Sequence, residues 1–121
     1  SKYKIEITFE GAYKDYFKEV TLLASKANNS GLAQIIGPSG KTIPAEKLND
    51  ENFSFSASNI FTINENTQEL KVKISMSNPS LGDKTPEATV HIKVYKDGKL
   101  ISEESGNATS KYEYSSSSTL S

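Results

Sequence analysis

The chain has 121 residues, of which 35% are hydrophobic and 24% are charged, a balance that predicts a soluble globular domain. All 14 basic residues are lysine and the net charge is -1, so the sequence lacks the concentrated positive surface that nucleic-acid binding needs. The absence of cysteine excludes disulfides, zinc-thiolate sites and thiol catalysis, and no apolar run approaches the roughly 20 residues of a membrane-spanning helix.

The N-terminal segment predicts a strand followed by a loop. Residues 3–10 place tyrosine, isoleucine or phenylalanine at every second position, which is the period-two pattern of a half-buried strand. Residues 11–16 then predict a loop. Residues 17–24 fit either a helix or a strand, and we favour a strand because the surrounding segments are strands.

The middle of the chain alternates short apolar runs with turn residues. Residues 32–36 predict a short buried strand, and the Gly-Pro and Ser-Gly pairs in residues 37–44 predict a tight turn. Residues 45–52 are polar and predict a crossover connection, with room for one helical turn. Residues 53–57 and 60–63 predict two further strands.

The strongest local signal comes in the second half of the chain. Residues 69–77 predict a strand with one apolar face, and the two prolines in residues 78–87 predict a loop. Residues 88–104 then read as a β-hairpin. Its turn is predicted at Asp97 and Gly98, because an Asp-Gly pair favours a two-residue turn with positive φ.

The C-terminal residues are the least apolar part of the chain. Residues 111–114 predict a last strand, and residues 115–121 (SSSSTLS) have too few apolar groups to offset their ordering entropy, so we expect a flexible tail. Residues 1–114 are therefore predicted to form a single domain. Short strands with frequent turn signals and no clear helix indicate an all-β fold, either a sandwich or a barrel, and clear in-out alternation favours an antiparallel two-sheet sandwich of about eight strands.

The single histidine, His91, follows the alternation of this hairpin. Because Val90 and Ile92 are expected to face the core, His91 is expected to face solvent. No Gly-x-Ser-x-Gly nucleophile elbow occurs that would pair a serine with it. We expect no catalytic residues.

Two groups of carboxylates are candidates for acid-base pairs. Glu6 and Glu10 share one strand face, and Glu103 and Glu104 lie late in the hairpin. A hydrolase of the glycosidase type would need two acids about 5–9 Å apart in a cleft. The sequence favours solvated charges that protect sheet edges, so we expect a protein that is not an enzyme.

Two loops contain oxygen ligands of the kind that calcium prefers. Residues 49–53 (NDENF) and 64–69 (NENTQE) are rich in Asn, Asp and Glu. Neither matches the EF-hand pattern, and Asn and Asp side chains commonly stabilise turns by bonding to nearby backbone. We therefore expect turn chemistry here, with no metal and no cofactor.

The candidate ligand site is the aromatic group Tyr13, Tyr16 and Phe17, which lies between two predicted strands. Tyrosines at the end of a sandwich can stack on sugar rings or anchor a protein partner. The same side chains can instead cap the core, and we favour that interpretation.

Two stretches carry a resemblance to known proteins. Residues 3–24 (YKIEITFEGAYKDYFKEVTLLA) and 91–104 (HIKVYKDGKLISEE), in a chain rich in Lys, Asn and Ser, resemble small secreted β-sandwich lipoproteins of Bacteroides-like bacteria, which are mostly uncharacterised. The resemblance implies an immunoglobulin-like sandwich that is exported to the periplasm or cell surface, with a possible lipid anchor upstream of Ser1. It supplies no site residues.

These observations favour a non-enzymatic exported module that binds a glycan or an envelope protein, or has a structural role, and is a monomer. One alternative is a carbohydrate-binding module that uses the loop aromatics. Another is a surface adhesion or assembly subunit, in which an edge strand pairs with a neighbouring molecule and residues 111–121 act as a donated strand.

Overall fold

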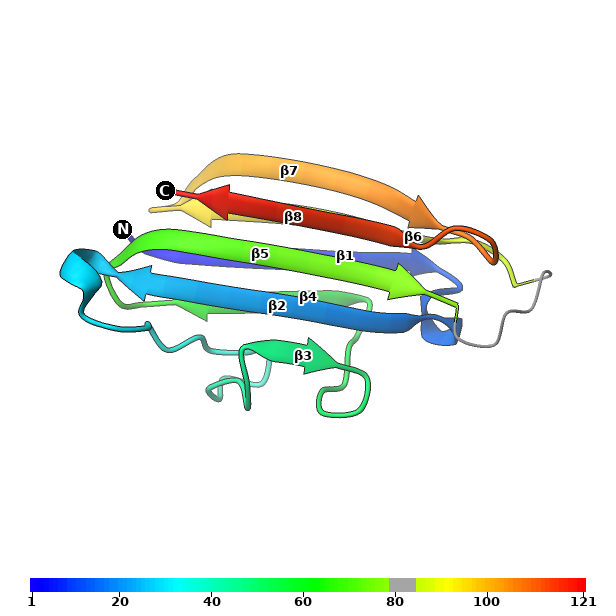
Figure 1. Cartoon of the computed structure of the whole chain (residues 1–121), viewed down its shortest axis with the longest axis horizontal. Helices are drawn as coiled ribbons and strands as arrows, with labels where there is room; N and C mark the ends of the chain where they lie inside the picture. The colour runs from blue at the N-terminus through cyan, green and yellow to red at the C-terminus, as the bar shows by residue number, and fades with distance from the viewer. Residues whose placement is uncertain (79–84) are drawn as a thin grey trace.

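The computed structural model describes residues 1–78 and 85–121, which form two antiparallel sheets packed face to face (Figure 1). In this part of the chain, sheet A has the strand order β4-β1-β6-β7 and sheet B has the order β3-β2-β5-β8. The strands are β1 (Tyr3–Gly11), β2 (Phe17–Lys26), β3 (Lys47–Asn49), β4 (Ser58–Ile63), β5 (Thr67–Ser77), β6 (Ala88–Lys96), β7 (Lys99–Ala108) and β8 (Tyr114–Leu120). Two short 3₁₀ helices, η1 (Tyr13–Asp15) and η2 (Ala27–Asn29), follow β1 and β2.

The fold confirms the predicted all-β sandwich. Its first strand, β1, pairs with β4 and β6, whereas a constant-type immunoglobulin domain places the first strand beside the second. The ambiguous residues 17–24 belong to β2, so the strand interpretation was correct. No helix among residues 1–78 and 85–121 is long and apolar enough to cross a membrane.

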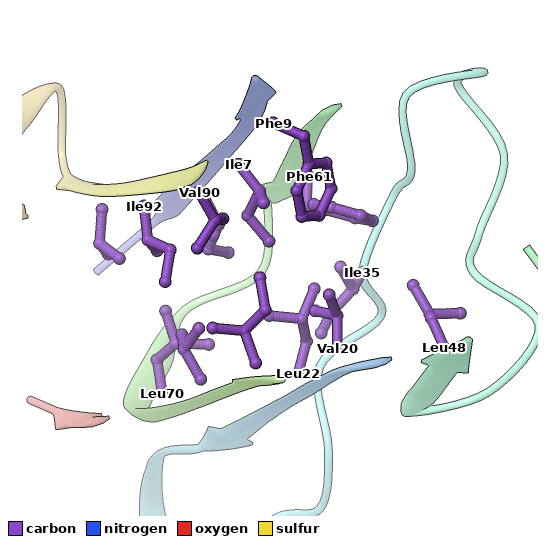
Figure 2. Packing of buried hydrophobic residues seen from close by; sticks show 14 of the residues in the cluster. Ile7, Phe9, Val20, Leu22, Ile35, Leu48, Phe61, Leu70, Val90 and Ile92 are labelled. Atoms are coloured by element: carbon purple, nitrogen blue, oxygen red, sulfur yellow. The ribbon is translucent and has the colours of Figure 1, made fainter. Parts of the chain in front are cut away.

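The core lies between the sheets, where every second side chain of the long strands points inward. Figure 2 shows the facing layers, with the sheet A residues opposite the sheet B residues and Ile35 and Leu48 on one side. Burial of one such side chain contributes about 1.5–3 kcal/mol, so this layer is the main source of stability. The labelled residues from sheet A are Ile7, Phe9, Phe61, Val90 and Ile92, and those from sheet B are Val20, Leu22, Leu48 and Leu70.

The β6–β7 hairpin has the predicted turn. Asp97 has φ 50° and Gly98 has φ 84°, which are the positive values that an Asp-Gly turn supplies. The Asp97 N–H donates to the Lys2 carbonyl and the Asp97 carboxylate accepts from the Lys2 N–H, each at 2.8 Å. The turn therefore also fixes the beginning of β1. Of the predicted loop 78–87, residues 79–84 lie outside the described residues.

Two predicted strands are not strands. Residues 32–36 begin against β2, where the Ala33 N–H donates to the Ala24 carbonyl, and end against β4, where Ile36 and Thr62 exchange two hydrogen bonds of 2.9 Å. This segment crosses from one sheet to the other and so forms only isolated bridges. Residues 53–57 pack Phe53 and Phe55 against the core without joining a ladder.

Two further predictions need correction. The crossover at residues 45–52 contains β3, which pairs with β2, instead of a helical turn. Residues 115–120 of the expected flexible tail belong to β8, which pairs with β5 along its whole length. The last strand thus begins at Tyr114, where the predicted last strand 111–114 ends.

The reason for the error at β8 is that its stabilising partners lie on another strand. Only Tyr114 and Leu120 pack partly against the core, which explains the weak sequence signal. The inward Ser116 and Ser118 donate hydrogen bonds to the Glu104 carboxylate of β7, at 2.6 and 3.2 Å. In Figure 1, β7 and β8 run along the same border of the sandwich.

Candidate functional site

The outer face of sheet A, meaning the outward side chains of β1, β6 and β7, carries His91 and three of the four glutamates considered as acid-base pairs. Because alternate residues of a strand point to opposite sides, the polar residues between the core positions all reach this face. Strand pairing aligns them in rows: Glu6 lies opposite Lys93, and Lys93 lies opposite Glu103. In the next row, Thr8, His91 and Ser105 are neighbours.

These rows enclose an open hollow of about 420 Å³, which we call the acidic hollow. One lysine stands between two carboxylates in its central row, and direct cross-strand pairs of opposite charge are favourable. The carboxylates outnumber the lysine, so the surface is rich in hydrogen-bond acceptors. Its principal lining residues are Glu6, Glu10, His91, Lys93, Glu103 and Ser105.

His91 lies on the floor of this hollow and is solvent-accessible, as predicted. Its side chain is 40% exposed, and its Nε2 lies 3.6 Å from a carboxylate oxygen of Glu10, whose side chain is 63% exposed. This distance exceeds a hydrogen bond, and the two groups attract strongly only when the imidazole is protonated. Ser105, the hydroxyl-bearing neighbour of His91 on β7, is itself exposed.

The structure arranges the two candidate carboxylate pairs differently. Glu6 and Glu10 both line the acidic hollow, together with Glu103. Glu104 also borders the hollow, but its carboxylate lies on the inward side of β7, where it accepts hydrogen bonds from Ser116 and Ser118. Adjacent residues in a strand point to opposite faces, so Glu103 and Glu104 cannot act as a pair.

A second hollow of about 420 Å³ adjoins the same sheet near the β6–β7 turn. It is lined by Lys4 and Tyr95, which pair across β1 and β6, and by Asp97 of the turn. The Lys4 ammonium lies 4.4 Å from the centre of the Tyr95 ring, within the range of a cation–π contact. Lys4 and Glu6 are two residues apart on β1, a rise of roughly 7 Å, so the two hollows are neighbours along this strand.

The predicted aromatic site does not form one exposed cluster. Tyr16 belongs to the core with an exposed fraction of 2%, and its hydroxyl donates to the Pro86 carbonyl at 2.9 Å. Tyr13 is half-buried and stacks on Phe9 with 5.7 Å between ring centres. Phe17 is half-buried and adjoins the inward residue Lys18 on β2, so it points to the outer side of sheet B. The structure therefore favours the core-capping interpretation for Tyr13 and Tyr16.

The loop at residues 49–53 uses its oxygen atoms in contacts within the protein. The Asn49 side chain accepts from the Glu51 and Asn52 N–H groups, and the Asn52 side chain accepts from the Asn49 N–H. Asp50 accepts from the Lys18 N–H at 2.7 Å. The contacts of Asn49 and Asn52 are the turn contacts that the sequence predicts.

The loop at residues 64–69 is similarly engaged. Glu65 forms an ion pair of 2.7 Å with Lys26 and accepts from the Gln34 N–H, and these contacts lower the pKa of its carboxyl below the usual value. The Asn66 side chain accepts from the Ser1 amino group. Within residues 1–78 and 85–121, no three His, Asp or Glu side chains lie close enough together to hold a metal ion.

The acidic hollow itself was not predicted. The sequence places Glu6 and Glu103 on outward strand positions, but it does not tell that β6 lies between β1 and β7 and brings both to Lys93. The local signal that was available is the strict alternation of polar residues in the three strands. Strand order decides which of these residues meet.

Comparison with known proteins shows what this fold resembles. No family model and no curated protein matches the sequence. The calcium-bound form of a protein from Parabacteroides distasonis, solved by NMR, has a TM-score of 0.80 at 18% identity, covering 99% of this chain and 92% of that chain. A DUF4425 domain of unknown function from Bacteroides vulgatus has a TM-score of 0.72 at 15% identity, covering 98% and 92%.

A DUF4425 family protein from Bacteroides ovatus is also similar, with a TM-score of 0.69 at 12% identity over 98% of this chain and 93% of that chain. At these identities the likeness establishes the fold over nearly the whole chain. It also agrees with the resemblance to Bacteroides-like proteins in the sequence.

Proposed function

We propose that this chain is a non-enzymatic binding module exported to the envelope of a bacterium, and that the outer face of sheet A is its ligand surface. The ligand class that this face fits best is a carbohydrate chain. Export, with or without a lipid anchor, is supported by the sequence resemblance and by the likeness in fold to Bacteroides and Parabacteroides proteins.

The observation that carries the proposal is the convergence of three strands on the acidic hollow. Glu6 and Glu103 offer acceptors to sugar hydroxyls, and Lys93 between them offers donors. The second hollow continues the surface toward Tyr95, whose ring has the amphipathic character that sugar recognition uses. An extended ligand that lies along β1 and β6 would contact both hollows.

The exposure of these side chains supports binding over hydrolysis. A general acid of a glycosidase needs a carboxyl group whose pKa is raised by an apolar, water-excluding site. Glu10 has a side chain that is 63% exposed, and Glu103 is also exposed, on an open sheet face. On this open face both carboxylates are accessible as hydrogen-bond acceptors for a ligand.

The experiment is a screen on a glycan array followed by an NMR titration of the hit with ¹⁵N-labelled protein. We expect saturable shifts confined to β1, β6 and β7, and we expect Glu103→Gln to weaken binding at least several-fold. Glu113→Gln is the matched control, because Glu113 is an exposed carboxylate that lines a hollow on the opposite sheet. Shifts centred on another surface, or no binding of any glycan, would refute the proposal.

Assembly through an edge strand is the second candidate function. Sheet A ends at β7, where Leu100 and Ile101 are 43% and 38% exposed. A free strand edge with exposed apolar residues can accept a strand from a neighbouring molecule. Sedimentation at rising concentration distinguishes the two, since assembly predicts a growing mass and the glycan-binding module predicts a monomer.

A further inference from the structure

The inner face of β2 contains a lysine where a core residue is expected. Lys18 precedes the buried Val20 and Leu22 on this face, and its side chain is only 4% exposed. Its ammonium group donates to the carbonyl oxygens of Tyr13 and Tyr16, each at 2.8 Å, and lies 3.4 Å from the Asp50 carboxylate. These three oxygen atoms form a site that we call the oxygen cradle.

Aromatic rings cover the cradle on the side of the core. The Lys18 ammonium lies 5.6 Å from the centre of the Tyr13 ring and 5.9 Å from that of Phe9, both within cation–π range. Burial of an ammonium ion is costly unless charges and hydrogen bonds compensate it, and here both are present. The site is thus built to hold a positive charge.

Its surroundings are negative as well. The pKa of the Tyr16 hydroxyl is raised by burial first and then by the nearby carboxylates of Glu87 and Asp15. Together with Asp50, these groups place several negative charges at the end of the sandwich that η1 forms. Among the described residues, Lys18 is the buried lysine at this end, whereas Lys14 of η1 is exposed.

The donor set is chemically that of a hard metal ion. Backbone carbonyls and carboxylates are the ligands that calcium takes in proteins. We propose that the oxygen cradle is a cation site in which Lys18 serves as the resident cation, so that this end of the sandwich is ordered without a dissolved metal. Shortening Lys18 would then open the cradle to Ca²⁺, completed by water.

This inference is separate from the proposed ligand surface, which lies on the outer face of sheet A. The similar protein from Parabacteroides distasonis was solved in a calcium-bound form. Among the described residues of this chain, no three acidic or histidine side chains are grouped so that they could hold a metal ion. In this chain the side chain of Lys18 supplies the positive charge.

The test is thermal unfolding of wild type and Lys18→Ala with EDTA or with about 5 mM CaCl₂, above the roughly millimolar dissociation constants of extracellular calcium modules. We expect wild type to be indifferent to calcium. Lys18→Ala should lose about 10 °C in Tm, because it leaves the Tyr13 and Tyr16 carbonyls without their buried donor and removes the partner of Asp50. Calcium should restore roughly 3–8 °C of that loss, as ligand binding to the native state predicts.

Matched variants separate a cation site from general salt effects. Lys18→Met keeps the cradle filled by an uncharged side chain and should be destabilised without rescue by calcium. Lys18→Ala combined with Asp50→Asn should lose the rescue, and choline chloride at equal ionic strength should not replace CaCl₂. Failure of calcium to stabilise Lys18→Ala, or equal stabilisation of wild type, would overturn the proposal.

A second test uses wild type alone and is independent of whether Lys18→Ala folds. The ammonium protons of a lysine held by three oxygens should exchange slowly with water and give a resolved ¹H–¹⁵N signal near neutral pH. The exposed Lys41 is the internal reference for fast exchange. A Lys18 ammonium group that exchanges as fast as that of Lys41 would contradict the proposal by itself.

Discussion

The Glu104 carboxylate on β7 accepts a hydrogen bond from the Ser116 hydroxyl on β8, with 2.6 Å between the two oxygen atoms. The second carboxylate oxygen accepts from Ser118 at 3.2 Å. Glu104 thereby joins the edge strand of one sheet to the edge strand of the other. This contact therefore attaches β8 to the border of the sandwich.

Glu104→Ala is expected to loosen β8 specifically. The loss of a charged acceptor leaves two half-buried hydroxyls without their partner, which costs about 1–3 kcal/mol. Hydrogen exchange should accelerate in Tyr114–Leu120 more than in β5. Glu103→Ala, one residue away on the outer face, is the control and should change stability by no more than about 0.5 kcal/mol. Equal effects of the two variants would show that Glu104 has no special role.

The ring of Tyr114 packs directly against Gly106 of β7 and leaves no room for a side chain there. A Cβ atom at this glycine would lie 2.0 Å from the Tyr114 Cε1 atom, a separation that no real structure tolerates. We expect Gly106→Ala to displace the ring and to cost roughly 1–3 kcal/mol, the range for overpacking.

A double-mutant cycle isolates this contact. In a Tyr114→Ala background the clash is absent, so Gly106→Ala should cost little or become stabilising, because alanine restricts the unfolded chain more than glycine does. Urea unfolding of the four proteins measures the coupling energy. Additive effects of the two substitutions would contradict the packing relationship.

These contacts explain why part of the fold was predictable and β8 was not. The core strands carry their own signal, since alternation in residues 3–10 and the turn at Asp97 and Gly98 depend on local sequence alone. The serines of β8 have no such signal. They are ordered by pairing with β5 and by the hydrogen bonds to Glu104, which lies on a strand of the other sheet.

The candidate site shows the same division between local and long-range information. The outward position of His91 follows from alternation and was predicted correctly. The burial of Tyr16 could not be predicted from strand alternation, because Tyr16 follows the short helix η1. Its burial depends on how η1 folds over the end of the core. Lys18 shares the inward face of β2 with Val20 and Leu22, and its three oxygen partners become neighbours only in the folded protein.

Tyr16→Phe is expected to reduce the decrease in the free energy of unfolding at alkaline pH. Burial and the neighbouring Glu87 and Asp15 raise the pKa of Tyr16 above its ordinary 10.0, so the folded state retains this proton longer than the unfolded state. Its contribution is present in full below pH 10 and is lost as the pH rises through the folded value. The variant lacks that loss but forfeits the hydrogen bond to Pro86, about 0.5–1.5 kcal/mol at neutral pH.

Urea midpoints of wild type and Tyr16→Phe between neutral pH and pH 11 measure this difference. The curves should converge as the pH rises, because only wild type loses the contribution of Tyr16. Tyr3, whose pKa burial and Asp97 also raise, remains in both proteins and sustains part of the slope. Tyr112→Phe is the control, since Tyr112 is 74% exposed. Parallel curves for wild type and Tyr16→Phe would disprove the assignment.

Asp97→Asn is expected to act at the opposite end of the pH scale. The hydrogen bond from the Lys2 N–H, assisted by Ser1 and by the positive charges of the amino terminus and Lys96, lowers the pKa of Asp97 below its ordinary 3.8. A lowered pKa means that the charged carboxylate stabilises the folded state above the unfolded value. That contribution is lost as the pH falls through the folded pKa.

Asparagine keeps the turn, because it also tolerates a positive φ and its side-chain oxygen can still accept from Lys2, but it carries no charge. The variant should therefore be less stable than wild type near neutrality and should approach wild type between pH 4 and pH 2, values that bracket the usual aspartate range. Thermal unfolding over this range is the measurement. Glu65, whose pKa is also lowered, preserves some acid sensitivity in both proteins. If the gap between the two proteins stays constant to the lowest pH, the Asp97 charge does not stabilise the join between the β6–β7 turn and β1.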